Sequence, residues 1–169
     1  MELCSQASFS DAHECKSIPI IAANVQRMIK PQQSQIWAVL RKDDDIHRVN
    51  YSLTAGFLGR LCLSGEIFDI PDKNWQITLE AIKFYGEIAP IIKDGYTKII
   101  ECTAEDYSDP AGYQIVLREL GDEALMIVHT FKDGANPPVE KYLENWQITK
   151  TFGSDLDGDF RGKAYLLEK

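Results

Sequence analysis

Apolar residues in the first part of the chain switch between a helical period and short uninterrupted runs. The stretch "SIPIIAANVQRMIKP" has the helical period, with one apolar face at Ile18, Ile21, Ala22, Val25 and Ile29. Ser17 is the expected N-cap of this helix, and Pro31 is expected to end it. The apolar run 36–40 that follows has no alternation, which predicts a parallel strand covered on both faces.

This alternation between helical apolar spacing and short apolar runs continues to about residue 94. "DDDIHRVNYSLTAGFLGR" predicts a helix capped by an aspartate, and "LCLSG" predicts a second buried strand. A long helix is predicted in "PDKNWQITLEAIKFYGEIAPIIKDG", with Gly95 as its left-handed stop. Strands that alternate with helices in this way are typical of right-handed parallel crossovers. The apolar face expected for the long helix consists of Trp75, Leu79, Ile82, Ala89 and Ile92.

After Gly95 the helical period disappears. "YTKIIECTA", "YQIVLREL" and "ALMIVHTF" are rich in β-branched and aromatic residues, and the short "GDE" between 113–120 and 124–131 predicts a hairpin. "VEKYLENWQITKTF" and "KAYLLEK" predict further strands. The pattern therefore divides the chain into an α/β part, residues 1–94, and an antiparallel β part, residues 95–169.

Charge and hydropathy narrow the classes of partner. The chain of 169 residues has a net charge of -8 and no run of basic residues, which argues against nucleic acids and anionic membranes as partners. No segment reaches the roughly 20 apolar residues that span a bilayer. The start "MELCSQASFS" lacks the regions of a signal peptide, which leaves the cellular location open with a preference for the cytoplasm.

Neither a metal nor a cofactor is indicated by the spacing of ligand-type residues. The four cysteines are widely separated, so they predict neither a zinc site nor a disulfide framework, and we expect buried or half-buried thiols. "SDLDGD" lacks the glycine position and the closing glutamate of a calcium loop. His129, inside an apolar run, is expected to be a hydrogen-bonded core or sheet-face residue. The cysteines are Cys4, Cys15, Cys62 and Cys102.

Carboxylates follow each of the predicted parallel strands. Asp11, His13 and Glu14 come after the first short strand, the aspartates 43–45 after the second and Glu66 after the third. In parallel α/β units, catalytic groups lie where strands lead into helices. Each position also has an ordinary explanation, because aspartates cap helices and Glu66 can be a simple loop acid.

Four segments in order carry a resemblance to a known family. "ASFSDAHE", "QSQIWAVLR", "FLGRLCLSGEIFDI" and "WQITLEAIKFYGEIAPIIKDG" resemble the last portion of glycoside hydrolases of the α-galactosidase (melibiase) type, family 36 of clan D. The resemblance implies strands six to eight of a TIM (β/α)8 barrel with their helices in residues 1–94, followed by a small antiparallel β-sandwich domain in residues 95–169. A whole barrel needs about 250 residues, so strands one to five would be absent and the chain would be a fragment.

The resemblance also implies a chemistry. Such enzymes are retaining glycosidases with two aspartates, and Ser10, Asp11 and Glu14 match the S-D-x-T-D type motif that holds the general acid/base. Asp11 is then the general acid/base, and Ser10, His13 and Glu14 are substrate contacts, with His13 in place of the usual threonine. The nucleophile belongs to a K-W-D motif that this sequence lacks. Because a retaining pair stands about 5–5.5 Å apart, we expect the isolated chain to be inactive.

The implied substrate is an oligosaccharide with terminal α-linked galactose, and the implied full-length parent is a homo-oligomer. A related α-glucosidase or α-N-acetylgalactosaminidase would keep the same mechanism. A non-catalytic carbohydrate- or protein-binding module is a further alternative. A three-strand piece also exposes a sheet edge and apolar helix faces, so we expect poor solubility or association. The aromatic residues available to a binding module are Tyr107, Tyr113, Trp146 and Tyr165.

Overall fold

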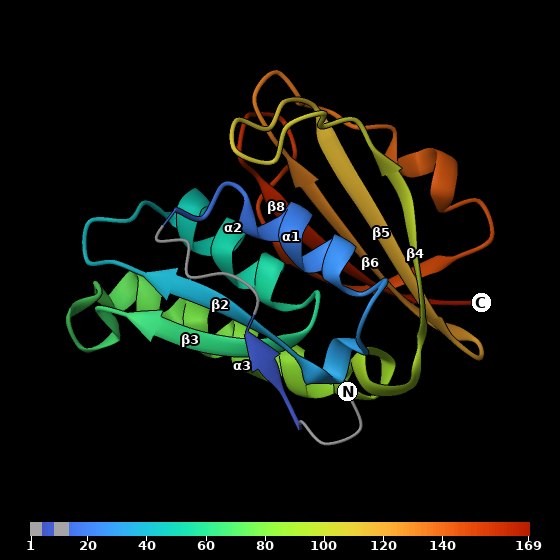
Figure 1. Cartoon of the computed structure of the whole chain (residues 1–169), viewed down its shortest axis with the longest axis horizontal. Helices are drawn as coiled ribbons and strands as arrows, with labels where there is room; N and C mark the ends of the chain where they lie inside the picture. The colour runs from blue at the N-terminus through green and yellow to red at the C-terminus, as the bar shows by residue number, and fades with distance from the viewer. Residues whose placement is uncertain (1–4, 9–13) are drawn as a thin grey trace.

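Three parallel strands, each followed by a helix, form the first part of the structure. The computed structural model describes residues 5–8 and 14–169, and its parallel sheet has the order β1-β2-β3. Figure 1 shows α1 and α2 lying between this sheet and a second, antiparallel sheet. The predicted alternation of parallel strands and helices is confirmed. The elements are β1 (Ala7–Ser8), α1 (Ile18–Val25), β2 (Ser34–Leu40), α2 (Ile46–Gly56), β3 (Arg60–Gly65) and α3 (Asp72–Asp94).

The second part is a five-stranded antiparallel sheet with the order β4-β5-β6-β8-β7. The predicted hairpin is present, and Gly121 in its turn has a φ of 61°, which favours glycine. Residues 139–142 form a short 3₁₀ helix, so the strand expected in this region begins only at Gln147. The described strands of this part form one sheet, not the two layers of a sandwich. They are β4 (Tyr96–Cys102), β5 (Tyr113–Leu120), β6 (Glu123–Thr130), β7 (Gln147–Gly153) and β8 (Gly162–Glu168).

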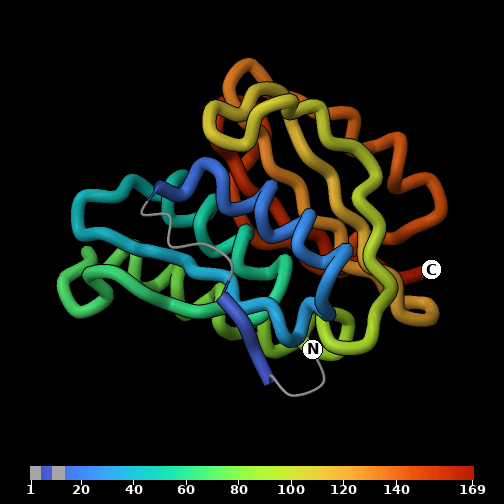
Figure 2. The backbone as a smooth tube through the Cα atoms, viewed as in Figure 1, coloured from blue at the N-terminus to red at the C-terminus, as the bar shows by residue number. Residues whose placement is uncertain are grey.

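Helix α2 is the centre of the molecule, because it packs against β2 on one side and β8 on the other. After α3 the chain crosses to the antiparallel sheet, as Figure 2 shows. One hydrophobic core runs through both sheets and all three helices. Phe57 after α2 lies 5.4 Å from Phe84 of α3 and 5.3 Å from Phe152 of β7, measured between ring centroids. These aromatic contacts join the α/β layer to the antiparallel sheet.

The parallel sheet is covered on one face only. Burial alternates along β2, so the expectation that both of its faces are covered is wrong. β3 is half-buried over most of its length, which also differs from the buried strand expected. The helices cover the side of Ile36 and Leu40, while Trp37 lies on the other face, where its Nε1 donates to Ser8 Oγ at 2.8 Å. The continuous apolar run therefore reflects one helix-covered face and one half-open face.

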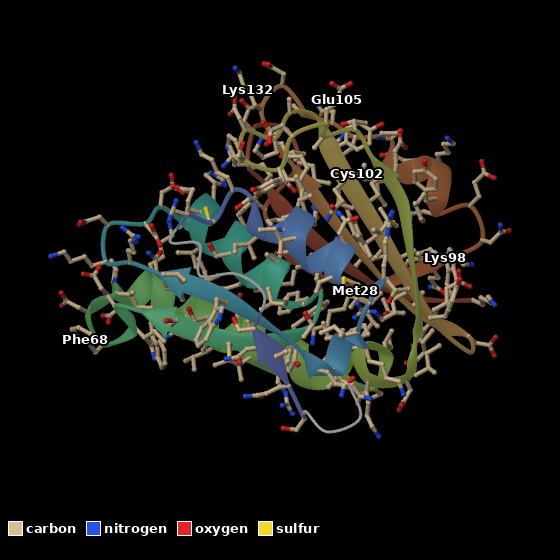
Figure 3. The ribbon with its side chains drawn as sticks, in the orientation of Figure 1. Met28, Phe68, Lys98, Cys102, Glu105 and Lys132 are labelled. Carbon is tan, nitrogen blue, oxygen red and sulfur yellow. The ribbon has the colours of Figure 1, made fainter. Side chains whose placement is uncertain are left out.

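Helix α3 buries a different side from the one that its apolar spacing predicted. Trp75, Leu79 and Ile82 are 37%, 41% and 44% exposed, so the expected core stripe is wrong for these positions. Asn74 and Thr78 face the core instead. Their polar side chains can be buried because both are hydrogen-bonded: Asn74 donates to the carbonyl of Asp44 and Thr78 to the carbonyl of Asn74. Phe68, at the tip of the segment between β3 and α3, is also exposed (Figure 3).

The helix ends also differ from the predictions. Ser17 precedes α1 but its side chain makes no capping hydrogen bond, and α1 ends at Val25, well before Pro31. Gly95 is extended, with a φ of -76°, so the predicted left-handed stop is wrong. A Cβ on Gly95 would lie 2.5 Å from the carbonyl oxygen of Ile91 and 2.8 Å from Arg118 Cγ. Close packing, not a left-handed turn, is therefore the reason for glycine here.

Candidate functional site

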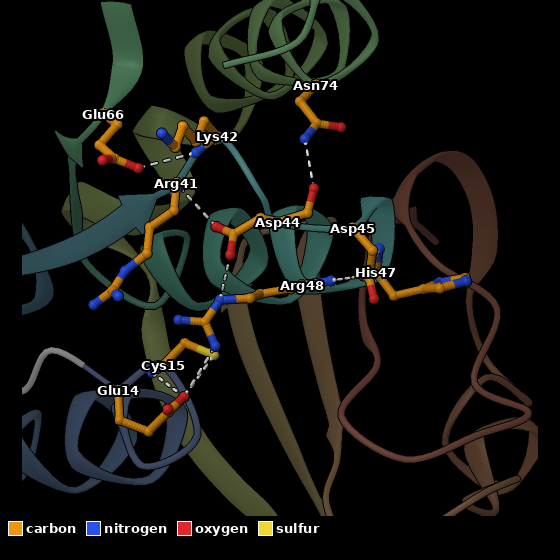
Figure 4. A network of polar contacts seen from close by, with 10 residues as sticks. All are labelled: Glu14, Cys15, Arg41, Lys42, Asp44, Asp45, His47, Arg48, Glu66 and Asn74. Carbon is orange, nitrogen blue, oxygen red and sulfur yellow. Dashed lines mark hydrogen bonds and ion pairs between the residues drawn. The ribbon is translucent and has the colours of Figure 1, made fainter. Parts of the chain in front are cut away.

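The predicted carboxylates that the structure describes follow the carboxyl ends of the three parallel strands. Ser10, Asp11 and His13 lie outside the described residues. Glu14 is the first described residue after them, and it lies near the start of α2 through its contact with Arg48. The candidate site is therefore built outward from Glu14 (Figure 4).

Glu14 is an ion-paired carboxylate. Its Oε1 lies 3.1 Å from Arg48 Nη1 and also accepts hydrogen bonds from the backbone N–H and the thiol of Cys15, at 2.8 and 3.3 Å. Partial burial raises the pKa of Glu14, but the hydrogen bonds from Cys15 and Arg48 and the charge of Arg48 outweigh it and hold the pKa below its ordinary value. At neutral pH Glu14 is therefore an ionised hydrogen-bond acceptor and not a proton donor.

Arg48 connects Glu14 to the loop that follows β2. Its Nε lies 2.7 Å from Asp44 Oδ1, and Asp44 Oδ2 accepts from the backbone N–H of Arg41 at 2.8 Å. The carbonyl of Asp44 in turn accepts from Asn74 Nδ2 on α3 at 2.8 Å. The segment after β1, the loop after β2 and the first turn of α3 are thus held together by one polar network, drawn in Figure 4.

The other predicted carboxylates have structural roles. Asp45 caps α2, and its Oδ1 accepts from the backbone N–H groups of His47 and Arg48, each at 2.9 Å. These backbone hydrogen bonds lower the pKa of Asp45. The helix-cap explanation for this aspartate is confirmed. Glu66 Oε2 accepts from the backbone N–H of Lys42 at 3.2 Å, so the acid after β3 ties that strand to the neighbouring loop.

Burial sets the protonation of the Cys15 thiol and the environment of the His129 imidazole. Burial raises the pKa of Cys15 to about 12, so its thiol stays protonated at neutral pH. Cys15 and Cys62 are half-buried as expected, whereas Cys102 is exposed and contradicts the expectation; Cys4 lies outside the described residues. His129 is fully buried, and its Nε2 lies 3.3 Å from the carbonyl oxygen of Tyr51, which confirms the core histidine.

The aromatic residues considered for a binding module do not share one exposed surface. Tyr165 is buried, and the hydroxyl of half-buried Tyr113 donates to Glu101 at 2.7 Å. Tyr107 is 60% exposed, while Trp146 packs against the outer core of the antiparallel sheet. Within the described part of the chain, no three His, Cys, Asp or Glu side chains are arranged to hold a metal ion. No described helix is long and apolar enough to cross a membrane.

The contact partner of Glu14 that sequence reasoning missed is Arg48. Its contact with Asp44 is local, because the two residues are four positions apart, on either side of the Asp45 cap of α2. The contact with Glu14 had no local signal, since it joins residues that are 34 positions apart. Figure 4 shows Arg48 between Asp44 and Glu14.

Comparison with solved structures identifies chains of the same fold. The α-galactosidase from Lactobacillus brevis matches with a TM-score of 0.67 at 10% identity. A variant of the GH36 α-galactosidase AgaA from Geobacillus stearothermophilus, in complex with raffinose, matches with 0.66 at 12%. The galactosidase domain of the α-galactosidase-sucrose kinase AgaSK matches with 0.65 at 11%.

Each match covers 94% of this chain and 25% of the other, so the chain spans about a quarter of the length of these structures. At such low identity the likeness concerns the fold. The predicted resemblance to a portion of the GH36 α-galactosidases is confirmed at that level, including the five-stranded antiparallel sheet. The sequence itself matches no family model and no curated protein.

Proposed function

We propose that this chain is the C-terminal part of a retaining, α-galactosidase-like glycoside hydrolase that removes terminal α-linked galactose from oligosaccharides. The observation that carries the proposal is the fold likeness to GH36 α-galactosidases over 94% of the chain. In this proposal residues 1–94 supply strands six to eight of a (β/α)8 barrel, and residues 95–169 supply the β-domain that follows it. Parallel strands followed by helices, and an open sheet face, support this assignment.

Asp11 is the general acid/base in the proposed reaction. It gives a proton to the glycosidic oxygen as the bond to the galactose carbon breaks, and it later takes a proton from the water that attacks the glycosyl-enzyme. This role needs a pKa near neutrality, which burial or a neighbouring carboxylate supplies. Glu14 contributes little of that repulsion, because Arg48 compensates its charge.

Glu14 and Arg48 act as substrate contacts in this proposal. They present an acceptor and a donor side by side, which suits adjacent hydroxyl groups of a sugar. Ser10 and His13 complete the set from the same segment. The nucleophile must come from a carboxylate about 5–5.5 Å from the acid/base, and the K-W-D motif that would carry it is not in this sequence. The proposal therefore assigns no hydrolysis to the isolated chain.

The test uses a longer gene product that contains this sequence, assayed on raffinose and on 4-nitrophenyl α-galactoside. Asp11→Asn should lower raffinose turnover by about 10²–10⁴-fold and affect the nitrophenyl substrate less, because nitrophenolate leaves without a proton. Asp43→Asn is the matched control, since Asp43 is an exposed acid of the β2–α2 loop. Undiminished raffinose turnover in Asp11→Asn would show that Asp11 is not the general acid/base. Parallel assays of the unsubstituted protein on α-glucosides and α-N-acetylgalactosaminides identify the sugar that it cleaves.

A further inference from the structure

We propose that Phe68 binds the part of the oligosaccharide that lies beyond the terminal galactose. This inference rests on the proposed function, because it assigns a further residue to the same substrate. Phe68 lies in the segment between β3 and α3, and 90% of its side chain is exposed. Burial of a phenylalanine side chain is favourable, so a ring that the fold leaves in water can still gain from contact with a ligand.

The exposed ring lies at the end of the parallel sheet where the proposed barrel has its active site. In Figures 1 and 3, Phe68 is at the end of the molecule toward which β2 and β3 point. Active sites of (β/α)8 barrels are built by the segments that follow the strands at this end. Further strand–helix units of a barrel would pack beside the strands and cover their edges. The segments beyond the strand ends, including Phe68, would stay open to the substrate.

The backbone that leads to Phe68 is fixed by a close approach to β2. Gly65 has a φ of 90°, and a Cβ at this position would collide with the carbonyl oxygen of Leu40. The same carbonyl accepts from the backbone N–H of Glu66 at 2.7 Å. Because glycine alone suits both the positive φ and the close approach, the chain can turn tightly across the end of β2 before it reaches Phe68.

Contacts on both sides of Phe68 hold its backbone in place. Ile67–Asp69 form a short 3₁₀ helix, in which the backbone N–H of Asp69 donates to the carbonyl of Glu66 at 2.8 Å. Ile70 then packs against the hydrophobic core, directly before α3. Binding therefore has to fix only the two side-chain torsions of Phe68. A group that is positioned in advance loses little conformational entropy on binding.

The polar network of the candidate site reaches the segment that carries Phe68. Glu66 Oε2 accepts from the backbone N–H of Lys42 at 3.2 Å, which ties the segment after β3 to the loop after β2. In that loop Asp44 pairs with Arg48, which also pairs with Glu14. Figure 4 shows these contacts from Glu66 to Glu14. The position of Phe68 is therefore linked to the segment after β1 by hydrogen bonds and ion pairs.

The order of the strands indicates which part of the substrate Phe68 contacts. In the proposed reaction Asp11, which follows β1, acts at the bond to the galactose, and β2 lies between β1 and β3. Neighbouring strands are about 4.8 Å apart, so β1 and β3 are about 10 Å apart. This separation places Phe68 beside a later sugar unit. The face of a phenyl ring is electronegative, and the C–H groups on one side of a pyranose or furanose ring pack against such a face.

The experiment measures ligand binding by the longer gene product, with Asp11→Asn in every protein so that raffinose is not consumed during calorimetric titration. Phe68→Ala should raise the dissociation constant of raffinose about tenfold. It should leave that of methyl α-galactoside unchanged, because this ligand has no second sugar. Phe68→Trp keeps an aromatic face and should bind raffinose at least as tightly as the protein with Phe68. Tyr96→Ala is the matched control, since Tyr96 is a 70% exposed ring that follows the far end of α3.

Equal raffinose dissociation constants in Phe68→Ala and Tyr96→Ala, or an absence of saturable raffinose binding, would overturn the assignment of Phe68. An equal loss for raffinose and methyl α-galactoside would also overturn it, because Phe68 would then not act on a second sugar. Hydrolysis by the protein with Asp11 intact tests the proposed function separately. Raffinose cleavage with unchanged binding in Phe68→Ala would contradict this inference alone. Weaker binding in Phe68→Ala without any cleavage would support Phe68 as a sugar contact and contradict the proposed hydrolase.

Discussion

The environments of Glu14 and His129 act on their charges in opposite ways. Arg48 and Cys15 favour the ionised form of Glu14, whereas the core around His129 disfavours its charged form. Glu14 can therefore hold a fixed negative charge at the candidate site, where Arg48 limits its effect on nearby acids. His129 remains neutral and contributes to packing, with Tyr51 5.0 Å away in an edge-to-face contact.

The burial of His129 predicts a loss of stability in mild acid. Burial lowers the pKa of His129 to about 3, from an ordinary value of 6.5. As the pH falls below 6.5, the unfolded chain binds a proton that the native state does not, so the free energy of unfolding falls by about 1.4 kcal/mol per pH unit. Urea unfolding of His129→Gln at pH 7 and pH 5 should show a smaller fall, by about 2 kcal/mol.

His47→Gln is the control for this experiment, because it leaves His129 in place and should keep the full fall. The lowered pKa values of Glu14, Asp45 and Glu101 cause a loss of stability only below their ordinary values, so the range from pH 7 to 5 isolates the imidazole. Identical pH dependence in His129→Gln and the parent chain would show that the buried histidine does not control acid stability.

At the scale of elements, Arg118 links the antiparallel sheet to the helices. It is 1% exposed on β5, and its Nη2 donates to Gln26 Oε1 and to the carbonyl of Leu58, both at 2.8 Å, while Nε donates to Thr97 Oγ1. Gln26 follows the last residue of α1, and Leu58 lies two residues after α2 ends. Helix C-termini carry partial negative charge, which stabilises a buried cation. Burial still lowers the pKa of Arg118 to about 10.

Arg118→Met should destabilise the protein by about 2–4 kcal/mol, because it leaves Gln26 Oε1 and Thr97 Oγ1 without the Arg118 donors and removes one of the two donors to the carbonyl of Leu58, the other being Gln26 Nε2. Arg118→Lys keeps the charge but cannot reach all three acceptors, so an intermediate loss is expected. Chemical denaturation at pH 7 measures both. Arg27→Met is the control, since Arg27 is exposed beside the end of α1; a loss in Arg118→Met no larger than in this control would disprove the role.

At the scale of the whole molecule, the α/β layer has open sides. β1 and β3 are edge strands of the parallel sheet, and one face of the sheet is only half covered. Trp75, Leu79 and Ile82 form an exposed apolar stripe on α3. Apolar stripes next to free strand edges promote association between chains. The same surfaces would be covered by further strand–helix units if the proposed barrel assignment is right.

We therefore expect the isolated chain to self-associate at high concentration, and Leu79→Lys to weaken this association. The substitution should leave the folding stability within about 1 kcal/mol, because Leu79 is 41% exposed. Sedimentation velocity between about 5 and 100 µM measures the effect. Gln76→Lys adds the same charge to an exposed position of α3 and serves as the control. A parent chain that stays monomeric over this range would contradict the prediction.

The sequence by itself determined the features that depend on local physics. The change from helical to strand spacing near residue 94 follows from the positions of the apolar side chains. The β5–β6 hairpin follows from its turn residues, and the Asp45 cap follows from the backbone N–H groups beside it. Each of these features is present in the structure. The position of Glu14 beyond the first parallel strand was equally clear from the order of elements.

Only the tertiary structure decided which surfaces and charges meet. The buried side of α3, the half-open face of β2, the pairing of Glu14 with Arg48 and the burial of Arg118 depend on layers packing together. Spacing along one helix shows that it has an apolar face, but several such faces can be buried, and contacts with other elements select among them. Pairings between distant residues leave no local pattern, because they arise only when the chain folds back on itself.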